Sequence, residues 1–546
     1  MSAPPLKRIR LWLRHSRRRA IGAASPTVWG VALILGVAVA YGVILFTLGV
    51  EALTRFTYGE GTTQLAQGAR GLDPGRTFIV PVIGGILVGT MLWIAVRLGI
   101  LRDIRCQGVA EVIEARASPP GYLSLRSGAV ATVVSATALG CGASAGREGP
   151  LVAMGGSIAT FFSQRLKIPA KDARTLLGCA AAAAVSAAFN APIAGVLFAL
   201  EVVLSNYALS IFGPVTLSSV SALVVTQLHF ENTHRFEIPD YVTPGVGALP
   251  LGALLGILCG IVAWTFLQSA AKARRTALGL MRRRIPAPFM PMIAGLGMGT
   301  IGMFLPEVLG FGYEATSEAI QGSYSLKLLL LLLVAKLFAT VLCLSCRFGT
   351  GVFSGGIYLG TITGAAFGTV LGAIFPEVAG YGATFFAMIG MGAVSGAIIG
   401  APISTTLIVF EITGDYQMTA TLMIAVGIAS MIVQVLFGSS WFHYQLNHRG
   451  YDLSDGPQGI ILKTIRVRDV MRAMPVDAAP LEKGAARLVA TETLGEALAQ
   501  MTDLGLDGMP VVPHEDSDKI IGTLTQIRAL KTYNAALIES HIEHHR

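Results

Sequence analysis

One short stretch of the sequence reads Gly146-Arg147-Glu148-Gly149-Pro150 and lies within a long apolar part of the chain. A carboxylate in that setting costs several kcal/mol unless it is paired or functional, so Glu148 is a candidate functional residue. The Gly149-Pro150 pair favours a helix start, because proline there gives up an N–H that would have no partner. The free amides and positive dipole of a helix start attract an anion. The stretch therefore predicts that an anion and the Glu148 side chain compete for one place, and that protonation of Glu148 releases it.

The composition places this stretch in a membrane. Of 546 residues, 53% are hydrophobic and 13% are charged, whereas soluble proteins carry roughly 25% charged residues. A bilayer core takes about 20 apolar residues per helix, and charge-free runs of that size recur from Thr27–Val50 to Gln417–Phe442. This excludes a soluble enzyme. It predicts an all-α polytopic membrane protein, a transporter or channel in contact with lipid.

The basic residues predict the orientation of the chain. The formal net charge is +9, with one basic cluster before the first apolar run and another between two later runs. By the positive-inside rule both clusters face the cytoplasm, so they indicate flanking charge and no nucleic-acid partner. We expect a multi-pass protein of the cell inner (plasma) membrane with cytoplasmic N- and C-termini. The clusters are Lys7, Arg8, Arg10, Arg14, Arg17, Arg18 and Arg19, and Lys272, Arg274, Arg275, Arg282, Arg283 and Arg284.

A second glycine-rich break and an internal repeat extend the argument. The break reads Gly351-Val352-Phe353-Ser354-Gly355, and irregular backbone at membrane depth must be covered by protein or face a watery cavity. The segments Ala191–Glu201 and Ala401–Glu411 share Ala, Pro, Ile, Leu and Glu at one constant offset, and each follows a break by a similar distance. Two duplicated halves, whose broken helices meet at a midplane site, are therefore expected. Glu201 and Glu411 are predicted to be helix-end or interface residues.

Three of these segments resemble the signature segments of the CLC family of chloride channels and proton/chloride antiporters. They are Gly146–Pro150, Gly351–Gly355 and Phe189-Asn190-Ala191-Pro192 running on to Glu201. The resemblance covers roughly residues 30–450. It implies a homodimer of many tilted helices, built from two inverted halves, with a separate anion pore in each subunit. Chloride is the implied transported anion, and no cofactor or covalent chemistry is involved.

The resemblance also implies the roles of individual residues. Glu148 matches the external gating glutamate of the family, and the amides of Phe353 and Ser354 match its central anion site. Arg147 has two interpretations, contact with the anion or a structural role in which it pairs with acids or carbonyls near the pore mouth. The anion-binding residues predicted in this way are Gln107, Gly108, Arg147, Gly149, Val352, Phe353, Ser354 and Phe442.

Two pore positions depart from the family pattern. The first pore motif of the family, Gly-Ser-Gly-Ile-Pro, reads Cys106-Gln107-Gly108-Val109-Ala110 here. The amide of Gln107 can still donate to an anion, but its bulk could shift selectivity among anions. The inner tyrosine of the family corresponds to Phe442, so its hydroxyl is missing unless the neighbouring His443 or Tyr444 substitutes for it.

A third departure bears on the mechanism. Antiporters of this family usually carry an internal glutamate directly after the position matched by Glu201, and Val202 stands there. A valine cannot relay a proton, which favours passive, channel-like conduction over coupled exchange. A proton-coupled chloride antiporter remains the alternative, with protons entering through water or another acid.

Other functional motifs are weak. Gly142-Ala143-Ser144-Ala145-Gly146 matches the G-x-S-x-G nucleophile pattern and raises an intramembrane serine hydrolase as a distant alternative. That chemistry needs a general base, and no histidine lies centrally in an apolar run. The cysteines give no paired metal-ligand spacing, so no metal site is predicted, and the lone C-x-x-C of Cys343 and Cys346 indicates small-residue packing.

The C-terminal tail has a soluble composition. We expect a basic N-terminus at 1–25, the two-halved anion pore domain at 26–450 and a small α/β cytoplasmic domain at 451–546. Val467-Arg468-Asp469-Val470-Met471, Thr493–Leu498 and Gly508–Val512 resemble one CBS (cystathionine-β-synthase-type) repeat. Such repeats normally work in pairs that can bind adenine nucleotides, so nucleotide sensing and a dimer-stabilising role both remain open.

Overall fold

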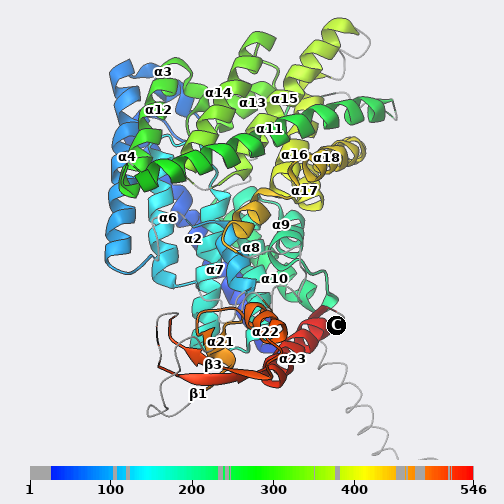
Figure 1. Ribbon diagram of the computed structural model, residues 1–546. Coiled ribbons are helices and arrows are strands. Elements are labelled where there is room, and N and C mark those ends of the chain that lie inside the picture. Colours follow the sequence, from blue (N-terminus) through cyan, green and yellow to red (C-terminus); the bar gives the residue numbers. More distant parts are fainter. Residues whose placement is uncertain are drawn as a thin grey trace, which may run out of the picture. The chain divides into compact units, whose positions relative to one another are not determined.

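The computed structural model divides the chain into two compact units (Figure 1). The first unit extends as far as Phe442, and the second begins at His443 and takes in the short segment Ala117–Gly121. The residues that the structure describes are 26–101, 107–117, 123–230, 238–239, 241, 245, 247–283, 285–349, 351–375, 382–450, 462, 465–473, 486–514, 517 and 519–544. The predicted N-terminal region 1–25 and Cys106 lie outside them.

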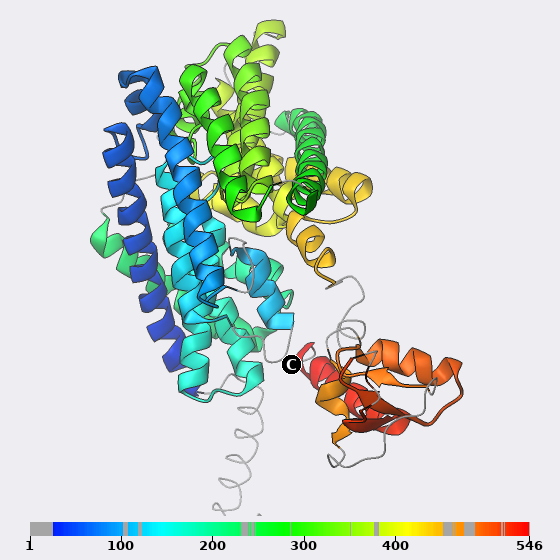
Figure 2. The same ribbon diagram turned by 60° about the vertical axis from the view of Figure 1, so that its left-hand side comes forward.

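The first unit is built from helices, and the last of them crosses the boundary of the unit at Phe442. In chain order they are α2 (Pro26–Tyr58), α3 (Leu65–Gly71), α4 (Pro74–Arg97), α5 (Val109–Ala117), α6 (Leu125–Gly140), α7 (Glu148–Arg165), α8 (Ala170–Phe189), α9 (Pro192–Phe198), the π-helix η1 (Ala199–Leu204), α10 (Leu209–His229), α11 (Ala248–Arg283), η2 (Ala287–Phe289), α12 (Met290–Phe304), η3 (Pro306–Val308), α13 (Tyr313–Ile320), α14 (Leu326–Ser345), α15 (Phe353–Ile374), α16 (Gly382–Ile399), α17 (Pro402–Thr413), α18 (Tyr416–Phe437) and α19 (Trp441–Asn447). Figure 2 shows these helices tilted at different angles.

Ten of the described helices are long and apolar enough to cross a membrane, which confirms the predicted polytopic, all-helical body. They differ in how much of the apolar stretch is covered by protein. In α16 the covered share is 89%, whereas in α4 it is 39%. Because the outer apolar side chains of α4, such as Ile83 and Trp93, are exposed, α4 lies at the apolar surface of this unit and α16 forms part of its interior.

Glycine allows the interior helices α15 and α16 to pack closely. A Cβ on Gly360 would lie 2.1 Å from the carbonyl oxygen of Gly390, and one on Gly364 would lie 1.9 Å from that of Phe386. Neither position has room for a side chain. Small residues thus bring two membrane helices into backbone contact, as is usual in helix packing within bilayers.

The internal repeat appears as a pair of reciprocal helix caps. The carboxylate of Glu201 accepts hydrogen bonds from the amides of Ile403 at 3.1 Å and Ser404 at 2.9 Å, at the start of α17. In the other half, the corresponding carboxylate caps the start of α9: Glu411 accepts from Ile193 at 2.9 Å and Ala194 at 2.7 Å. Both glutamates are therefore helix-end and interface residues, as predicted. Each glutamate accepts hydrogen bonds from helix-start amides of the other half, which would otherwise have no partner.

The second basic cluster differs from its predicted place in a loop. Helix α11 has 36 residues and extends through Lys272 and Arg282 to Arg283. The apolar part of the helix is followed by about three more helical turns that carry the basic side chains, because lysine and arginine are good helix formers. The basic residues that follow this apolar run therefore lie on the C-terminal end of α11.

The second unit is a small α/β domain. Its described elements are α21 (Val467–Val470), β1 (Arg472–Ala473), β2 (Leu488–Val489), α22 (Leu494–Asp503), β3 (Gly508–Val512), β4 (Gly522–Thr525) and α23 (Gln526–His544). The sheet order is β1-β4-β3-β2, with β2 parallel to β3 and the other pairs antiparallel. Figure 2 shows this sheet with its helices. The small sheet is consistent with the expected CBS-like tail.

A capping box begins helix α22 in this unit. The Thr493 hydroxyl accepts a hydrogen bond from the Glu496 amide at 3.2 Å, and the Glu496 carboxylate accepts one from the Thr493 amide at 2.8 Å. The Thr493 hydroxyl also lies 2.9 Å from the same carboxylate oxygen, and the hydrogen bonds that the Thr493 amide and hydroxyl donate to it lower the pKa of Glu496. The helix buries Leu494, Ala497 and Met501 against the sheet.

Candidate functional site

The two glycine-rich breaks of the sequence meet in the structure. The amide of Gly146 donates a hydrogen bond of 2.8 Å to the carbonyl of Gly351, and the two residues form an isolated antiparallel bridge. A Cβ on Gly351 would lie 2.2 Å from the Gly146 carbonyl oxygen, and one on Gly146 would lie 2.3 Å from Oε2 of Glu148. Position 351 therefore requires glycine, whereas a side chain at Gly146 would displace the Glu148 carboxylate, and the bridge joins segments from the two halves of the repeat.

Two helices begin beside this bridge. Helix α7 begins at Glu148 after the N-cap Arg147, and α15 begins at Phe353 after the N-cap Val352. Neither N-cap side chain accepts a hydrogen bond from its helix. Since the first amides of a helix have no partner within it, both starts leave donors and a positive dipole end for another acceptor.

The carboxylate of Glu148 lies at the start of α15. The Ser354 hydroxyl donates a hydrogen bond of 2.6 Å to Oε1 of Glu148, across 206 residues of sequence. Glu148 is 5% exposed and Ser354 is also buried. Among the described residues, Oε2 of Glu148 has no hydrogen-bond partner. An acidic side chain thus lies where the sequence predicted that an anion would be attracted.

Arg147 is held by protein groups on several sides. Its guanidinium donates a hydrogen bond of 2.6 Å to the carbonyl of Ala188 and lies over the rings of Phe311 at 5.8 Å and Tyr313 at 5.5 Å. Cation–π contacts of this kind stabilise a buried charge. These contacts fit the structural interpretation of Arg147 better than direct contact with an anion.

The remaining residues at the α7 and α15 starts are apolar or small. The ring of Phe353 packs edge to face on Phe189 with the centroids 5.0 Å apart. Gly149 and Val352 are buried beside them. The structure thus brings together five of the predicted residues: Glu148, Gly149, Val352, Phe353 and Ser354.

The segment at Gln107 shows a contact that the sequence interpretation missed. The amide of Gly108 donates a hydrogen bond of 2.6 Å to the carboxylate of Glu111, at the start of α5. The spacing is that of a capping box, in which a glutamate reaches back three residues, so the sequence contained the signal. The predicted anion donor Gly108 therefore has an acceptor within the protein. Gln107 is half-buried just before it.

Two predicted positions lie on other elements. Val202 is in the π-helix η1, directly after the capping residue Glu201, and Phe442 is the second residue of α19. Both side chains are buried. Neither side chain can donate a hydrogen bond, so any contact that either makes with an anion is apolar.

Ser144 has a hydroxyl partner in place of a base. Its Oγ lies 3.1 Å from Oγ1 of Thr340 on α14, and both side chains are buried. A serine nucleophile requires a general base within hydrogen-bond reach. The recorded partner is a second alcohol, so this geometry does not support the hydrolase alternative. Cys343 and Cys346, at the end of the same helix, are free and buried.

One buried amine escaped the sequence interpretation. Lys336 on α14 is 1% exposed, and its Nζ donates hydrogen bonds to the carbonyls of Val308 at 2.9 Å and Gly310 at 3.0 Å. The same nitrogen lies 4.7 Å from the ring centroid of Tyr358. A lysine in the middle of a 20-residue apolar helix, away from the helix ends, was the available signal.

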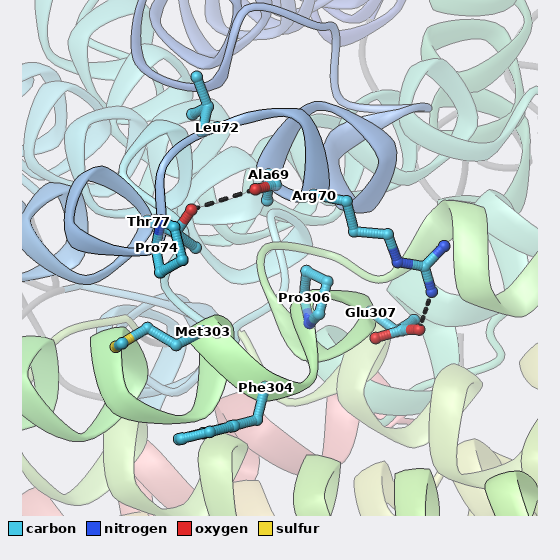
Figure 3. A pocket seen from close by; sticks show the side chains of 10 residues that line it. Ala69, Arg70, Leu72, Pro74, Thr77, Met303, Phe304, Pro306 and Glu307 are labelled. Atoms are coloured by element: carbon cyan, nitrogen blue, oxygen red, sulfur yellow. Dashed lines mark hydrogen bonds and ion pairs between the residues drawn. The ribbon is translucent and has the colours of Figure 1, made fainter.

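A cavity of about 250 Å³ lies beside Pro306 and Glu307, directly before the residues that Lys336 contacts. Figure 3 shows it between α3, the start of α4, the end of α12 and η3. Arg70 donates to Oε1 of Glu307 within it, while Oε2 of Glu307 has no partner among the described residues. In the described part of the chain no cluster of three or more His, Cys, Asp or Glu residues could hold a metal ion.

Sequence comparison shows the family. The matching family is described as Voltage gated chloride channel and covers residues 85–434. Chloride channel protein CLC-e of Arabidopsis thaliana is 28% identical over 428 residues, which is 73% of this chain and 59% of the plant protein. Putative chloride channel protein ClcB-like of Ralstonia nicotianae is 30% identical over 401 residues, covering 72% of this chain and 91% of that protein. H(+)/Cl(-) exchange transporter ClcA of Vibrio cholerae is 33% identical over 317 residues, covering 57% and 67%.

A solved structure shows the same fold. The crystal structure of a slow cyanobacterial Cl-/H+ antiporter aligns with a TM-score of 0.69 at 22% identity, over 78% of this chain and 99% of that chain. The fold therefore agrees with the inverted-repeat architecture that the sequence predicted. The chain belongs to the voltage gated chloride channel (CLC) family, whose members are transporters or channels, use no cofactor and are not enzymes.

Proposed function

We propose that the chain conducts chloride passively through a pore that opens when Glu148 is protonated. One observation carries the proposal: the hydrogen bond of 2.6 Å from Ser354 to Glu148 holds a carboxylate at the start of α15. Because uncapped helix starts attract negative charge, the carboxylate and a chloride ion compete for the same donors.

Protonation removes the basis of that competition. A charged acceptor makes hydrogen bonds roughly twice as strong as a neutral one, and the attraction to the helix dipole requires the charge. Neutral Glu148 therefore leaves the α15 start more readily, and chloride takes its place. In this proposal the amides around Gly149, Phe353 and Ser354 bind the anion beside Val352, while Arg147 stays with its carbonyl and aromatic partners.

The inner residues define the rest of the proposed path. Gln107 offers an amide donor, and Gly108 becomes available to chloride when Glu111 moves from its amide. Phe442 supplies an apolar wall without the tyrosine hydroxyl of the family pattern. Without a tyrosine hydroxyl to donate a hydrogen bond, the pore beside Phe442 holds the anion less firmly, which favours passive conduction.

Val202 is the main reason to prefer conduction over exchange. A coupled antiporter needs a proton path from the inside to Glu148, and a valine in place of the internal glutamate gives no titratable group. The alternative is a proton-coupled chloride antiporter, which the name of the Vibrio cholerae relative favours. In that case protons reach Glu148 through water or another acid.

The resemblance supports further parts of the proposal. We place the protein as a homodimer in the plasma membrane, with both termini in the cytoplasm. The pore domain comprises 26–450 and the basic region 1–25 precedes it. The domain at 451–546 stabilises the dimer as a CBS-like module, and nucleotide binding there is a second possibility to test by adding ATP.

The reversal potential of the purified protein in liposomes separates the two mechanisms. A chloride gradient is imposed first at symmetric pH and then with a pH gradient. A passive pore keeps the chloride Nernst potential under both conditions. A reversal potential that moves with the pH gradient would establish coupled exchange and overturn the channel proposal, whereas the absence of any chloride current would overturn both.

A further inference from the structure

Lys336 is a buried basic side chain that the proposed gate does not use directly. Burying an ammonium group costs several kcal/mol unless good hydrogen bonds replace water. Among the described residues no carboxylate forms an ion pair with it; the carbonyls of Val308 and Gly310 and the ring of Tyr358 surround its nitrogen. The glycine at 312 leaves it space, because a Cβ there would lie 3.2 Å from Nζ.

The loop that Lys336 holds leads to the gate. After Gly310 the chain continues into Phe311 and Tyr313, whose rings pack on the Arg147 guanidinium. Arg147 directly precedes Glu148. The same loop also contacts the segment before the gate, because the Gly310 amide donates a hydrogen bond of 3.3 Å to the Gly142 carbonyl.

The next turn of α14 contacts the other side of the site. Thr340, four residues after Lys336, lies 3.1 Å from the Ser144 hydroxyl, and a Cβ on Gly355 would lie 3.0 Å from its methyl group. Tyr358 likewise follows Ser354 by one turn of α15. Residues four apart share a helix face, so one face of α14 contacts the Val308–Gly310 loop, the segment before the gate at Ser144 and the start of α15.

We propose that Lys336 is a positioning residue for the gate. By holding the Val308–Gly310 carbonyls it fixes the aromatic pair that keeps Arg147 beside Glu148. The inference rests on the proposed function of Glu148. The titratable groups that act on Glu148 in the described chain are Arg147 and, from α13, Tyr313, with Lys336 on α14 behind them. When the loop loosens, Arg147 moves, the carboxylate loses stabilising positive charge, and it protonates at a higher pH.

The test compares chloride efflux from liposomes across pH for the wild type, Lys336→Met and Lys336→Arg. Lys327→Met is the matched control, because it removes an exposed lysine from the same helix. We expect Lys336→Met to move the midpoint of the pH profile upward by roughly one unit, the shift that about 1.4 kcal/mol of lost interaction gives. Lys336→Arg restores most of the wild-type profile, and Lys327→Met leaves it unchanged.

A double variant shows whether the effect passes through the gate. In a Glu148→Gln background the gate no longer titrates, so Lys336→Met should leave efflux unchanged there. An equal effect in both backgrounds would overturn the inference, as would a wild-type midpoint in a monodisperse Lys336→Met protein or an equal shift in Lys327→Met.

Phe311→Leu tests the same chain of contacts, from the loop to Arg147, without changing Lys336. It should move the midpoint in the same direction, and an unchanged midpoint would overturn the inference even if Lys336→Met fails to fold. Failure of the proposed function is distinguishable, since it would appear as a wild-type efflux that does not respond to pH.

Discussion

The Ser354 hydroxyl lies 2.6 Å from Oε1 of Glu148 and joins the two halves of the chain at their helix starts. The glycine bridge between residues 146 and 351 brings the two segments together, and the absent side-chain caps leave donors unsatisfied. A carboxylate in this position is held by its charge. The gate can therefore be tested through the acid, through the hydroxyl and through the elements that hold both in place.

Replacing the acid should remove the pH response. We expect Glu148→Gln to conduct chloride at every pH, because the amide is neutral and cannot titrate. Efflux from liposomes between acidic and neutral pH measures this. Glu51→Gln is the control, since it removes another carboxylate from the membrane body, at 26% side-chain exposure, and should retain the wild-type profile. A full pH response in Glu148→Gln would disprove the assignment of the gate.

Removing the hydroxyl should weaken the closed state. A hydrogen bond to a charged group contributes about 1.5–3 kcal/mol, so Ser354→Ala should favour the open state by roughly tenfold or more. We expect higher chloride efflux at neutral pH and a pH midpoint displaced upward. Ser395→Ala is the matched control, because this buried serine bonds to its own helix at Met391. Equal effects of the two substitutions would mean that packing, and not the gate contact, is measured.

The sequence predicted the parts of this site that local chemistry determines. The acid between glycines indicated Glu148, and the repeat offset indicated that Glu201 and Glu411 would end helices at an interface. Their reciprocal caps, with Glu201 on α17 and Glu411 on α9, confirm both the duplication and the contact between halves.

Other features depend on tertiary contacts that no local pattern contains. Lys336 acquires its partners from a loop about 26 residues away, and its sequence context shows only an apolar helix with a second lysine, Lys327, near its start. Arg147 was ambiguous because its aromatic partners, Phe311 and Tyr313, follow more than 160 residues later. Helix α11 passes the point where hydrophobicity ends, since helix propensity and not apolar character determines where a helix stops.

The reciprocal caps should contribute to stability. We expect Glu411→Ala to lower the free energy of unfolding by about 1–3 kcal/mol, because two amides of α9 lose a charged acceptor at the interface. Thermal unfolding in detergent, followed by circular dichroism, measures the change. Glu60→Ala, at an exposed turn, is the control and should remain near the wild-type value. An unchanged unfolding temperature in Glu411→Ala would mean that water replaces the carboxylate there.

The capping box of the second unit gives a prediction in the soluble part of the chain. Thr493→Ala should destabilise α22 by about 1 kcal/mol, the usual contribution of an N-cap. The lowered pKa of Glu496 means that its contribution is present above the unfolded value of roughly 4.3 and is lost as pH falls through the lower folded value. Amide hydrogen exchange of α22 in the full chain measures both effects. Thr502→Ala, at the other end of the helix, is the control. Equal exchange in both variants would contradict the cap.

Restoring a glutamate at 202 tests why this chain should conduct passively. If the missing acid alone prevented coupling, Val202→Glu would make the reversal potential follow a pH gradient. We expect Val202→Glu by itself to keep the chloride Nernst potential, because Phe442 still lacks the hydroxyl that would hold an anion during exchange. The double variant Val202→Glu/Phe442→Tyr should then show coupling. Val202→Gln/Phe442→Tyr is the control, with a side chain of similar size that carries no proton. Strong coupling in Val202→Glu alone would show that Phe442 has little part in the mechanism, and coupling in the glutamine control would show that protons reach Glu148 by another path.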